Sequence, residues 1–216
     1  MLHRLKGALK YSLVPLLYRY PPSSLEPQRL AVFLHGLLEI DGVEGDVGEI
    51  GCNHGGTAVL AATLLKRIDS RKRYICYDTF GGFVDAQFEI DARSGTARAM
   101  RHDFSGNSIG LVRKILDFHR CQSVELVAGD ITVLPEDQLL PRYAALPIDV
   151  DLSEPTYRSL QRFWPRMAPG GIIYVDDCPD HSDWRAREGY RRFCQEENLP
   201  ETYRCGLGLL RKPLAH

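Results

Sequence analysis

Short apolar runs alternate with stretches of helical spacing along most of this chain. Continuous or alternating apolar runs predict strands, and apolar residues three or four positions apart predict helices. The predicted strands are 45–50, 73–78, 123–130, 143–151 and 171–177, and the predicted helices are 57–68, 109–120, 153–167 and 183–198. The sequence APGG (168–171) is expected to end the third of these helices, and 202–212 to form a closing hairpin. This alternating order predicts an α/β fold with a mostly parallel sheet.

The first 42 residues have a different pattern. Their apolar run is broken at Lys10 and interrupted at Pro15, and no small-residue cleavage site follows, so a signal peptide is not favoured. No segment reaches the roughly 20 apolar residues that a membrane span needs. We expect residues 1–42 to form a helical lead-in that packs on a single domain, 43–216, without stable membrane insertion. A helix lying on a membrane surface is the alternative.

Residues 79–107 form a long polar stretch with GG, RSG and SGN breakers and little periodicity. Loops of this length inside compact domains are usually functional or disordered. We therefore expect this segment to act as a lid over a site.

The composition excludes some functions. The chain has 216 residues, a net charge near −1 and no basic run, so a nucleic-acid partner is not expected. Its six cysteines include no C-x-x-C pair, which favours free thiols in a reducing compartment and a cytoplasmic location. The apolar N-terminus offers a surface for pairing, so a homo-oligomer is one possibility.

Ligands of open α/β sheets collect where the strands end. The first predicted strand ends in a glycine-rich turn, GEIGCNHGG (48–56), whose backbone can approach a ligand closely. The spacing of Gly48, Gly51 and Gly55 differs from the G-x-G-x-x-G pattern of dinucleotide-binding sites, which counts against NAD. Asp78 ends the second strand and is placed to accept the hydroxyls of a ribose.

Four aspartates end the next two strands: Asp149 and Asp151 after the fourth, and Asp176 and Asp177 after the fifth. Carboxylates gathered on neighbouring strand ends repel each other unless a cation joins them. Oxygen ligands of this kind suit Mg²⁺ or a similar divalent ion. The alternative is structural, because single aspartates often cap helices and turns.

The glycine-rich loop, the acid at the second strand and the third strand end resemble the class I S-adenosylmethionine-dependent methyltransferases. A closer resemblance is to the macrocin-type sugar O-methyltransferases. It rests on GDVGEIGCNHGGTA, YDTFGGF, IDVDLSEPTYRSLQRFWPRMAPGGIIYVDD and LLRK, and it covers about residues 43–212. It implies a Rossmann-like, mostly parallel seven-stranded sheet with an antiparallel closing hairpin and helices on both faces.

The resemblance also implies roles for individual residues. The implied S-adenosylmethionine-binding residues are Glu49, Gly51, Asn53, Gly55, Asp78, Thr79, Gly129, Asp130 and Asp149. The implied Mg²⁺ ligands are Asp149, Asp176 and Asp177, and Asp151 is the implied catalytic base. The implied reaction is metal-dependent O-methylation of a hydroxylated small molecule, such as a vicinal diol of a sugar on a natural product or glycolipid.

Other interpretations remain open. A catechol-type enzyme of the same fold commonly carries a lysine three residues after its first metal aspartate, where this chain has Leu152. A non-catalytic nucleotide-binding domain is the alternative of another class. His54 and His102 are weaker candidates for the base. Cys178 and His181 could suggest zinc, but their crowded spacing fits no common zinc pattern.

Overall fold

A computed structural model describes residue 6 and residues 9–179 and 183–214 of the chain. Its seven strands form one sheet in the order β3-β2-β1-β4-β5-β7-β6. The strands are β1 (Asp46–Ile50), β2 (Tyr74–Asp78), β3 (Glu125–Ala128), β4 (Tyr143–Ile148), β5 (Met167–Val175), β6 (Tyr203–Arg204) and β7 (Leu207–Arg211). Neighbours from β3 to β5 are parallel, whereas β7 runs antiparallel to both β5 and β6. The predicted fold class, including the antiparallel closing hairpin, is confirmed.

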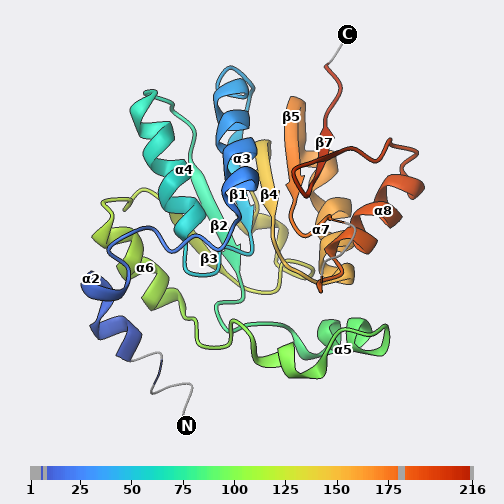
Figure 1. Cartoon of the computed structure of the whole chain (residues 1–216). Coiled ribbons are helices and arrows are strands. Elements are labelled where there is room, and N and C mark those ends of the chain that lie inside the picture. Colours follow the sequence, from blue (N-terminus) through green and yellow to red (C-terminus); the bar gives the residue numbers. More distant parts are fainter. Residues whose placement is uncertain (1–5, 7–8, 180–182, 215–216) are drawn as a thin grey trace.

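Helices cover both faces of this sheet (Figure 1). The α-helices are α2 (Val14–Leu17), α3 (Pro27–Glu39), α4 (Gly56–Arg67), α5 (Asp85–Arg93), α6 (Ile109–Phe118), α7 (Ser153–Phe163) and α8 (Ala186–Glu196), and short 3-10 turns lie at Arg98–His102, Glu136–Gln138 and Trp164–Arg166. One core joins α3, α4 and α6 to the sheet, and the other joins α7 and α8 to its opposite face. The strands alternate between these cores: Cys76 of β2 packs in the first, and Ile75 and Tyr77 pack in the second.

The N-terminal segment packs on this framework. Val14 and Tyr18 are buried against Leu111 and Ile115 of α6 and form a small core of their own. Residues 22 and 23 then pass over the start of α4, where a Cβ on Gly56 would lie 2.3 Å from the backbone nitrogen of Ser23. None of the helices in the described part of the chain is long and apolar enough to cross a lipid bilayer.

Two sequence predictions were wrong at the level of elements. The sequence APGG does not end a helix: α7 stops at Phe163, and β5 begins at Met167 and runs through the two glycines. Pairing explains this, because Met167 lies in register with Tyr143 and the Gly170 amide donates to the carbonyl of Lys212. The segment 79–107 is not without regular structure either, since it contains α5 and a 3-10 turn.

Candidate functional site

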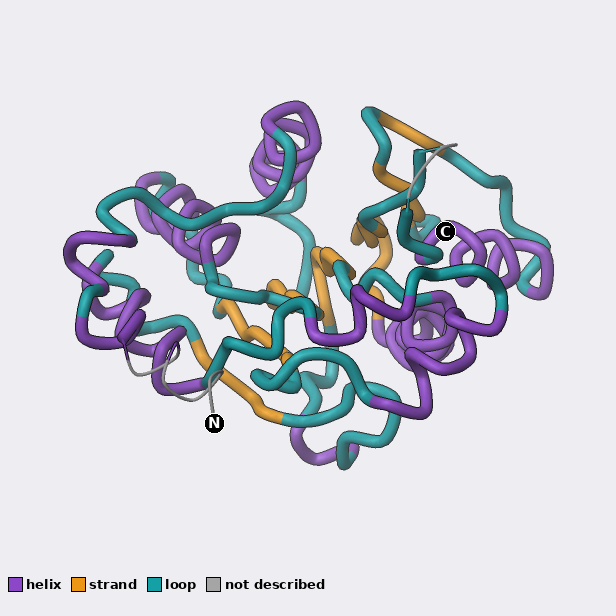
Figure 2. Tube along the Cα trace, turned by 60° about the horizontal axis from the view of Figure 1, so that its bottom comes forward, coloured by secondary structure: helices purple, strands orange, loops and turns teal. Residues whose placement is uncertain are grey.

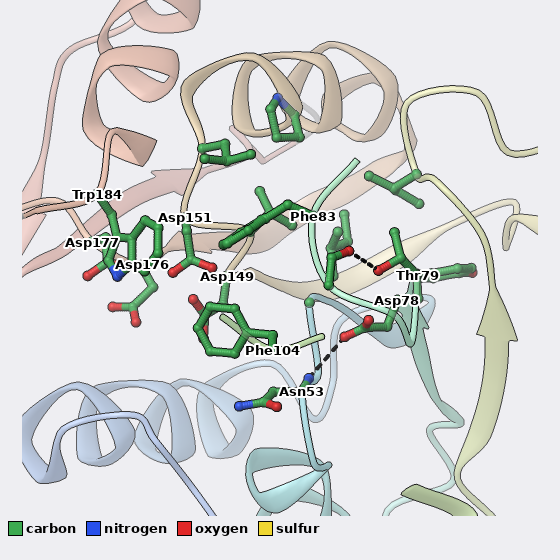
Figure 3. Close-up of a pocket in the computed structure, with 18 of the residues that line it drawn as sticks. Asn53, Asp78, Thr79, Phe83, Phe104, Asp149, Asp151, Asp176, Asp177 and Trp184 are labelled. Carbon is green, nitrogen blue, oxygen red and sulfur yellow. Dashed lines mark hydrogen bonds between the residues drawn. The ribbon is translucent and has the colours of Figure 1, made fainter. Parts of the chain in front are cut away.

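A cavity of about 340 Å³ lies where strands β1 to β5 end. Its wall combines the loops after these strands, the start of α3, the segment 79–107 and Trp184, as Figure 3 shows. Ten of the twelve site residues expected from the sequence line it: Gly51, Asn53, Asp78, Thr79, Gly129, Asp130, Asp149, Asp151, Asp176 and Asp177. The topology therefore brings these distant positions to one place.

The turn after β1 needs a glycine at its first position. Gly51 has a φ of +83°, and a Cβ there would lie 1.8 Å from the carbonyl oxygen of Asp149. The turn continues through Asn53, which also has a positive φ of 46°. The backbone amide of Asn53 donates to Asp78 Oδ2 at 3.0 Å, and its side-chain Oδ1 is buried with no hydrogen-bond partner among the described residues. An acceptor without a partner at a cavity wall suits a ligand that brings a donor.

Asp78 is held in a fixed orientation at the end of β2. Its two carboxylate oxygens accept hydrogen bonds from the backbone amides of Asn53, at 3.0 Å, and Phe80, at 2.7 Å. Burial raises the pKa of Asp78, and these amides partly oppose that rise. The next residue, Thr79, turns back and donates to the carbonyl of Gly82 at 2.6 Å.

Glu49 and Gly55 do not line the cavity. Glu49 is 3% exposed and accepts a hydrogen bond from the Tyr74 hydroxyl at 2.9 Å. Burial raises the pKa of Glu49 to about 7. Gly55 begins α4 with a φ of +76° and packs against Val112 of α6. These two residues shape the loop from behind rather than face the cavity.

The segment 79–107 reaches the end of β3. Gln87 of α5 donates from its amide to Asp130 Oδ2 at 2.8 Å and to Thr132 Oγ1 at 3.1 Å. Asn107, at the other end of the segment, donates to the carbonyl of Asn53 at 2.6 Å. Sequence reasoning missed both residues, because a single polar side chain in a polar stretch carries no local signal.

The four aspartates divide into three and one. Carboxylate oxygens of Asp149, Asp151 and Asp177 all lie within 4.8 Å of one another. Asp151 and Asp177 reach this arrangement with positive φ angles of 62° and 52°. A non-glycine residue held this way costs on the order of 1 kcal/mol, although aspartate tolerates it better than most residues. Strain of this kind at neighbouring acids is typical of functional sites.

Asp176 instead pairs with Arg29, a residue that sequence reasoning missed. Nη1 of Arg29 lies 2.7 Å from Asp176 Oδ1 and 3.3 Å from Asp177 Oδ1, and the Arg29 side chain is only 11% exposed. Arg29 comes from the first turn of α3, well outside the aspartate motifs. No spacing in the sequence connects it with them.

The pKa values of three of the four aspartates, Asp149, Asp151 and Asp176, are raised. Burial, followed by repulsion from Asp176, Asp151 and Asp177, raises the pKa of Asp149 well above its ordinary value. Burial and Asp177 do the same to the pKa of Asp151. Burial and Asp177 raise the pKa of Asp176 to about 6, although Arg29 opposes this. A cation among the carboxylates would relieve this repulsion.

Three aromatic side chains line the cavity together with the aspartates. Phe83 and Phe104 come from the segment 79–107, and Trp184 comes from the loop before α8 (Figure 3). Their ring centroids lie 5.4 Å (Phe83–Trp184), 5.5 Å (Phe83–Phe104) and 6.1 Å (Phe104–Trp184) apart. The cavity is thus lined by both carboxylates and a cluster of aromatic rings.

The weaker sequence candidates lie elsewhere. His54 is packed against the ring of Tyr18, and burial lowers the pKa of its imidazole to about 4. Neither His54 nor His102 lines the cavity. Cys178 is buried, while its suggested zinc partner His181 lies outside the described residues.

Comparison with known protein families shows which family the chain belongs to. Residues 28–203 match the macrocin O-methyltransferase (TylF) family. This chain belongs to that family. The matched region holds all twelve expected site residues and Arg29, so the family resemblance seen in the sequence is confirmed.

Two curated relatives and one solved structure illustrate the similarity. The chain is 31% identical over 165 residues to 8-demethyl-8-(2,3-dimethoxy-alpha-L-rhamnosyl)-tetracenomycin-C 4'-O-methyltransferase of Streptomyces olivaceus. The aligned region covers 69% of this chain and 61% of that protein. It is 29% identical over 152 residues to demethyldecarbamoylnovobiocin O-methyltransferase of Streptomyces niveus, with coverages of 65% and 56%. The chain therefore spans about six tenths of the length of these relatives. The structure of the O-methyltransferase NovP superposes with a TM-score of 0.73 at 17% identity, covering 98% of this chain and 99% of that one, which shows a shared fold.

Proposed function

We propose that this chain is an S-adenosylmethionine-dependent O-methyltransferase that methylates a hydroxyl of a sugar-bearing small molecule with the help of a divalent cation. The observation that carries the proposal is the shared cavity: the fixed carboxylate of Asp78 and the aspartate cluster line the same space. A nucleoside and an acceptor hydroxyl bound at these two places would be neighbours. One of the relatives named above methylates a rhamnosyl-bearing compound, as its name states.

The donor end of the cavity fits S-adenosylmethionine. Asp78 offers an oriented carboxylate for the ribose hydroxyls, and the unpartnered Oδ1 of Asn53 can accept from the ammonium of the methionine part. Gly51 lets the backbone come close, and Gly129 and Asp130 lie where the adenine would be held. When bound, S-adenosylmethionine supplies a methyl group on a sulfonium, already activated for transfer.

The acidic end fits a divalent cation. Carboxylate oxygens of Asp149, Asp151 and Asp177 lie within 4.8 Å of one another. Burial, followed by repulsion from neighbouring aspartates, raises the pKa values of Asp149 and Asp151, so the site favours positive charge, and oxygen donors suit Mg²⁺. The proposed ligands are Asp149, Asp176 and Asp177, so that Asp176 would exchange Arg29 for the ion. A bound divalent ion would lower the pKa of acceptor hydroxyls.

The chain's own residues then have two tasks. The first is alignment, because orienting the acceptor against the donor can contribute about 7–11 kcal/mol to catalysis. The rings of Phe83, Phe104 and Trp184 can pack on one face of the acceptor while the carboxylates hold its hydroxyl edge. The second is proton removal: Asp151 takes the proton of the attacking hydroxyl as the new oxygen–carbon bond forms and the sulfur–carbon bond breaks.

The segment 79–107 is proposed as the cover of this site. It contributes Phe83, Gln87, Phe104 and Asn107 to the cavity wall. A phenolic acceptor of the catechol type is less favoured, because Leu152 stands where that group commonly has a lysine, and Leu152 lines the cavity.

Calorimetric titration with S-adenosylmethionine tests the donor site. Asp78→Ala should weaken binding at least about tenfold, the loss expected from one charge-assisted hydrogen bond of about 1.5–3 kcal/mol. Asp137→Ala, which changes an exposed aspartate outside the cavity, is the matched control. Failure of the unaltered chain to bind S-adenosylmethionine would overturn the proposal.

Methyl transfer is then measured by mass spectrometry on a panel of rhamnosides and catechols, with Mg²⁺ or with excess chelator. Transfer to a rhamnoside that the chelator abolishes supports the whole proposal. Transfer to catechols alone would overturn the sugar assignment, and transfer that survives chelation would overturn the metal role.

A further inference from the structure

An apolar face on the N-terminal segment has no partner in the fold. Along residues 9–20 the buried side chains are Val14 and Tyr18, which point to α6. Four other large side chains of this segment are exposed, Leu9 (61%), Leu16 (74%), Leu17 (53%) and Tyr20 (77%), while Tyr11 (46%) lies against Lys114 of α6. This is the densest run of exposed large apolar residues in the described chain. Packing on α6 explains why the buried side of this segment is apolar, but it does not explain why the exposed side is apolar as well.

The charge around this face has one sign. The sequence from 1 to 25 carries Arg4, Lys6, Lys10 and Arg19 and no aspartate or glutamate. The neighbouring helix α6 adds Arg113 and Lys114, against a single acid, Asp117, and Lys114 Nζ lies 4.0 Å from the ring centre of Tyr11.

These cations also differ from most arginines of the described surface. Arg158 pairs with Glu154 at 2.8 Å, and Arg98 pairs with Glu89 at 2.7 Å. Lys6, Lys10 and Arg19 take part in no ion pair among the described residues. Their charge is therefore free to meet an external anion.

The N-terminal segment also touches the segment 79–107, which contributes to the cavity wall. Lys10 Nζ is 3.8 Å from the place of a Cβ on Gly106, and the next residue, Asn107, lines the cavity. Figures 1 and 2 show α2 and α5 at the edge of the sheet where the parallel strands end.

We propose that the outer face of residues 9–20 docks on the surface of an anionic lipid bilayer. Exposed leucines on a basic helical segment, together with Tyr20, have the composition of helices that lie in the membrane interface. The long stems of Lys6 and Arg19 can follow the apolar surface while their charges reach lipid headgroups. A second copy of the chain is a poorer occupant, because a twofold contact would gather the basic side chains of both copies in one interface.

Sedimentation with lipid vesicles tests this proposal on the full chain. We expect binding to phosphatidylcholine vesicles that contain phosphatidylglycerol and little binding to pure phosphatidylcholine. Lys10→Gln with Arg19→Gln should weaken binding about 25-fold, since one cation near such a surface contributes about fivefold. Leu16→Glu with Leu17→Glu should abolish binding, whereas Leu214→Glu, equally exposed at 73% but remote from this face, should not change it.

Thermal melting of each variant checks that these surface changes leave the fold intact. Equal binding to both kinds of vesicle, or none to either, would overturn the proposal. So would a dimer in light scattering that Leu16→Glu dissociates, because a second copy would then be what covers the face. The test needs neither S-adenosylmethionine nor an acceptor, so its outcome is independent of the proposed methyl transfer.

Discussion

Replacing Arg29 by methionine should destabilise the protein in a way that depends on pH. Methionine keeps much of the aliphatic volume of arginine but removes the guanidinium that contacts Asp176 at 2.7 Å and Asp177 at 3.3 Å. Both the Arg29 and the Asp176 side chains are about nine-tenths buried, at 11% and 10% exposed. The variant would therefore leave a carboxylate buried without its counter-charge.

The size of the effect follows from this burial. Breaking a buried ion pair by removing one partner costs about 3–5 kcal/mol. We take the lower end, because Asp177 and the cavity keep some access to water. For a domain of this size, about 3 kcal/mol corresponds to a Tm lowered by about 6–12 °C.

The pH dependence follows from the pKa of Asp176. Its pKa is about 6 in the folded protein, above its ordinary value of 3.8, so the folded state binds this proton more tightly than the unfolded state. The stability that this proton contributes is present below about pH 4 and is lost as pH rises through about 6. Without Arg29 the pKa of Asp176 rises further. The deficit of the Arg29→Met variant should thus be small near pH 5 and complete near pH 8.

Urea unfolding of the metal-free protein at these two pH values measures the effect. Arg98→Met is the matched control, because the Arg98–Glu89 pair is exposed and its loss should leave the unfolding midpoint nearly unchanged at both pH values. Adding Asp176→Asn to Arg29→Met should recover at least half of the loss, since the uncompensated charge is gone. A loss below about 1 kcal/mol at pH 8, or an equal loss at both pH values, would refute the reasoning from the buried ion pair.

Three further predictions concern stability. Asp91→Ala should cost about 2 kcal/mol in urea unfolding, because buried Asp91 accepts from the amide and hydroxyl of Ser153 and so caps α7; an unchanged midpoint would contradict this. Gly51→Ala should cost about 3 kcal/mol or more, because its methyl group would meet the carbonyl of Asp149, and a variant with normal Tm would show that the turn can move. The metal-free protein should lose stability as pH rises from 5 to 8, because the pKa values of Asp149 and Asp151 are raised in the folded state, which therefore holds their protons more tightly than the unfolded state; Mg²⁺ should raise Tm more at pH 8 than at pH 5, and equal Tm gains would argue against a cation at these acids.

The sheet could be predicted from the sequence because each parallel strand is a continuous apolar run buried on both faces. The predicted ends of the strands were less accurate. Strand β3 covers Glu125–Ala128 rather than 123–130, and β4 stops at Ile148, before Asp149 and Asp151. Strand ends depend on which neighbour continues the hydrogen bonding, and a single run does not contain that information. The aspartates could still be grouped correctly, because parallel strands end at one edge.

Helix α5 could not be predicted, because its stability comes from distant contacts. Only Phe88 and Asp91 are buried along Asp85–Arg93, so it carries no apolar stripe. It is tied to the domain by Asp91, which accepts from the amide of Ser153 at 2.7 Å, and by Gln87, which donates to Asp130. Those partners lie 62 and 43 residues away in the sequence. Local periodicity contains neither contact.

The ion pair between Arg29 and Asp176 follows from the spacing of residues on α3 and on β5, which pack against each other in one core. On α3, Arg29, Phe33 and Gly36 are four and three residues apart, so they lie on one face of the helix. On β5, the ring of Tyr174 packs edge-on against the ring of Phe33, with the two ring centroids 5.4 Å apart. A Cβ on Gly36 would lie 1.6 Å from the Tyr174 hydroxyl, so the absence of a side chain there allows the helix to approach the strand. Asp176, two residues beyond Tyr174, then lies beneath Arg29, two helical turns before Gly36. The strand alone would leave its aspartates without a counter-charge, and the register of α3 places the Arg29 guanidinium 2.7 Å from Asp176 and 3.3 Å from Asp177.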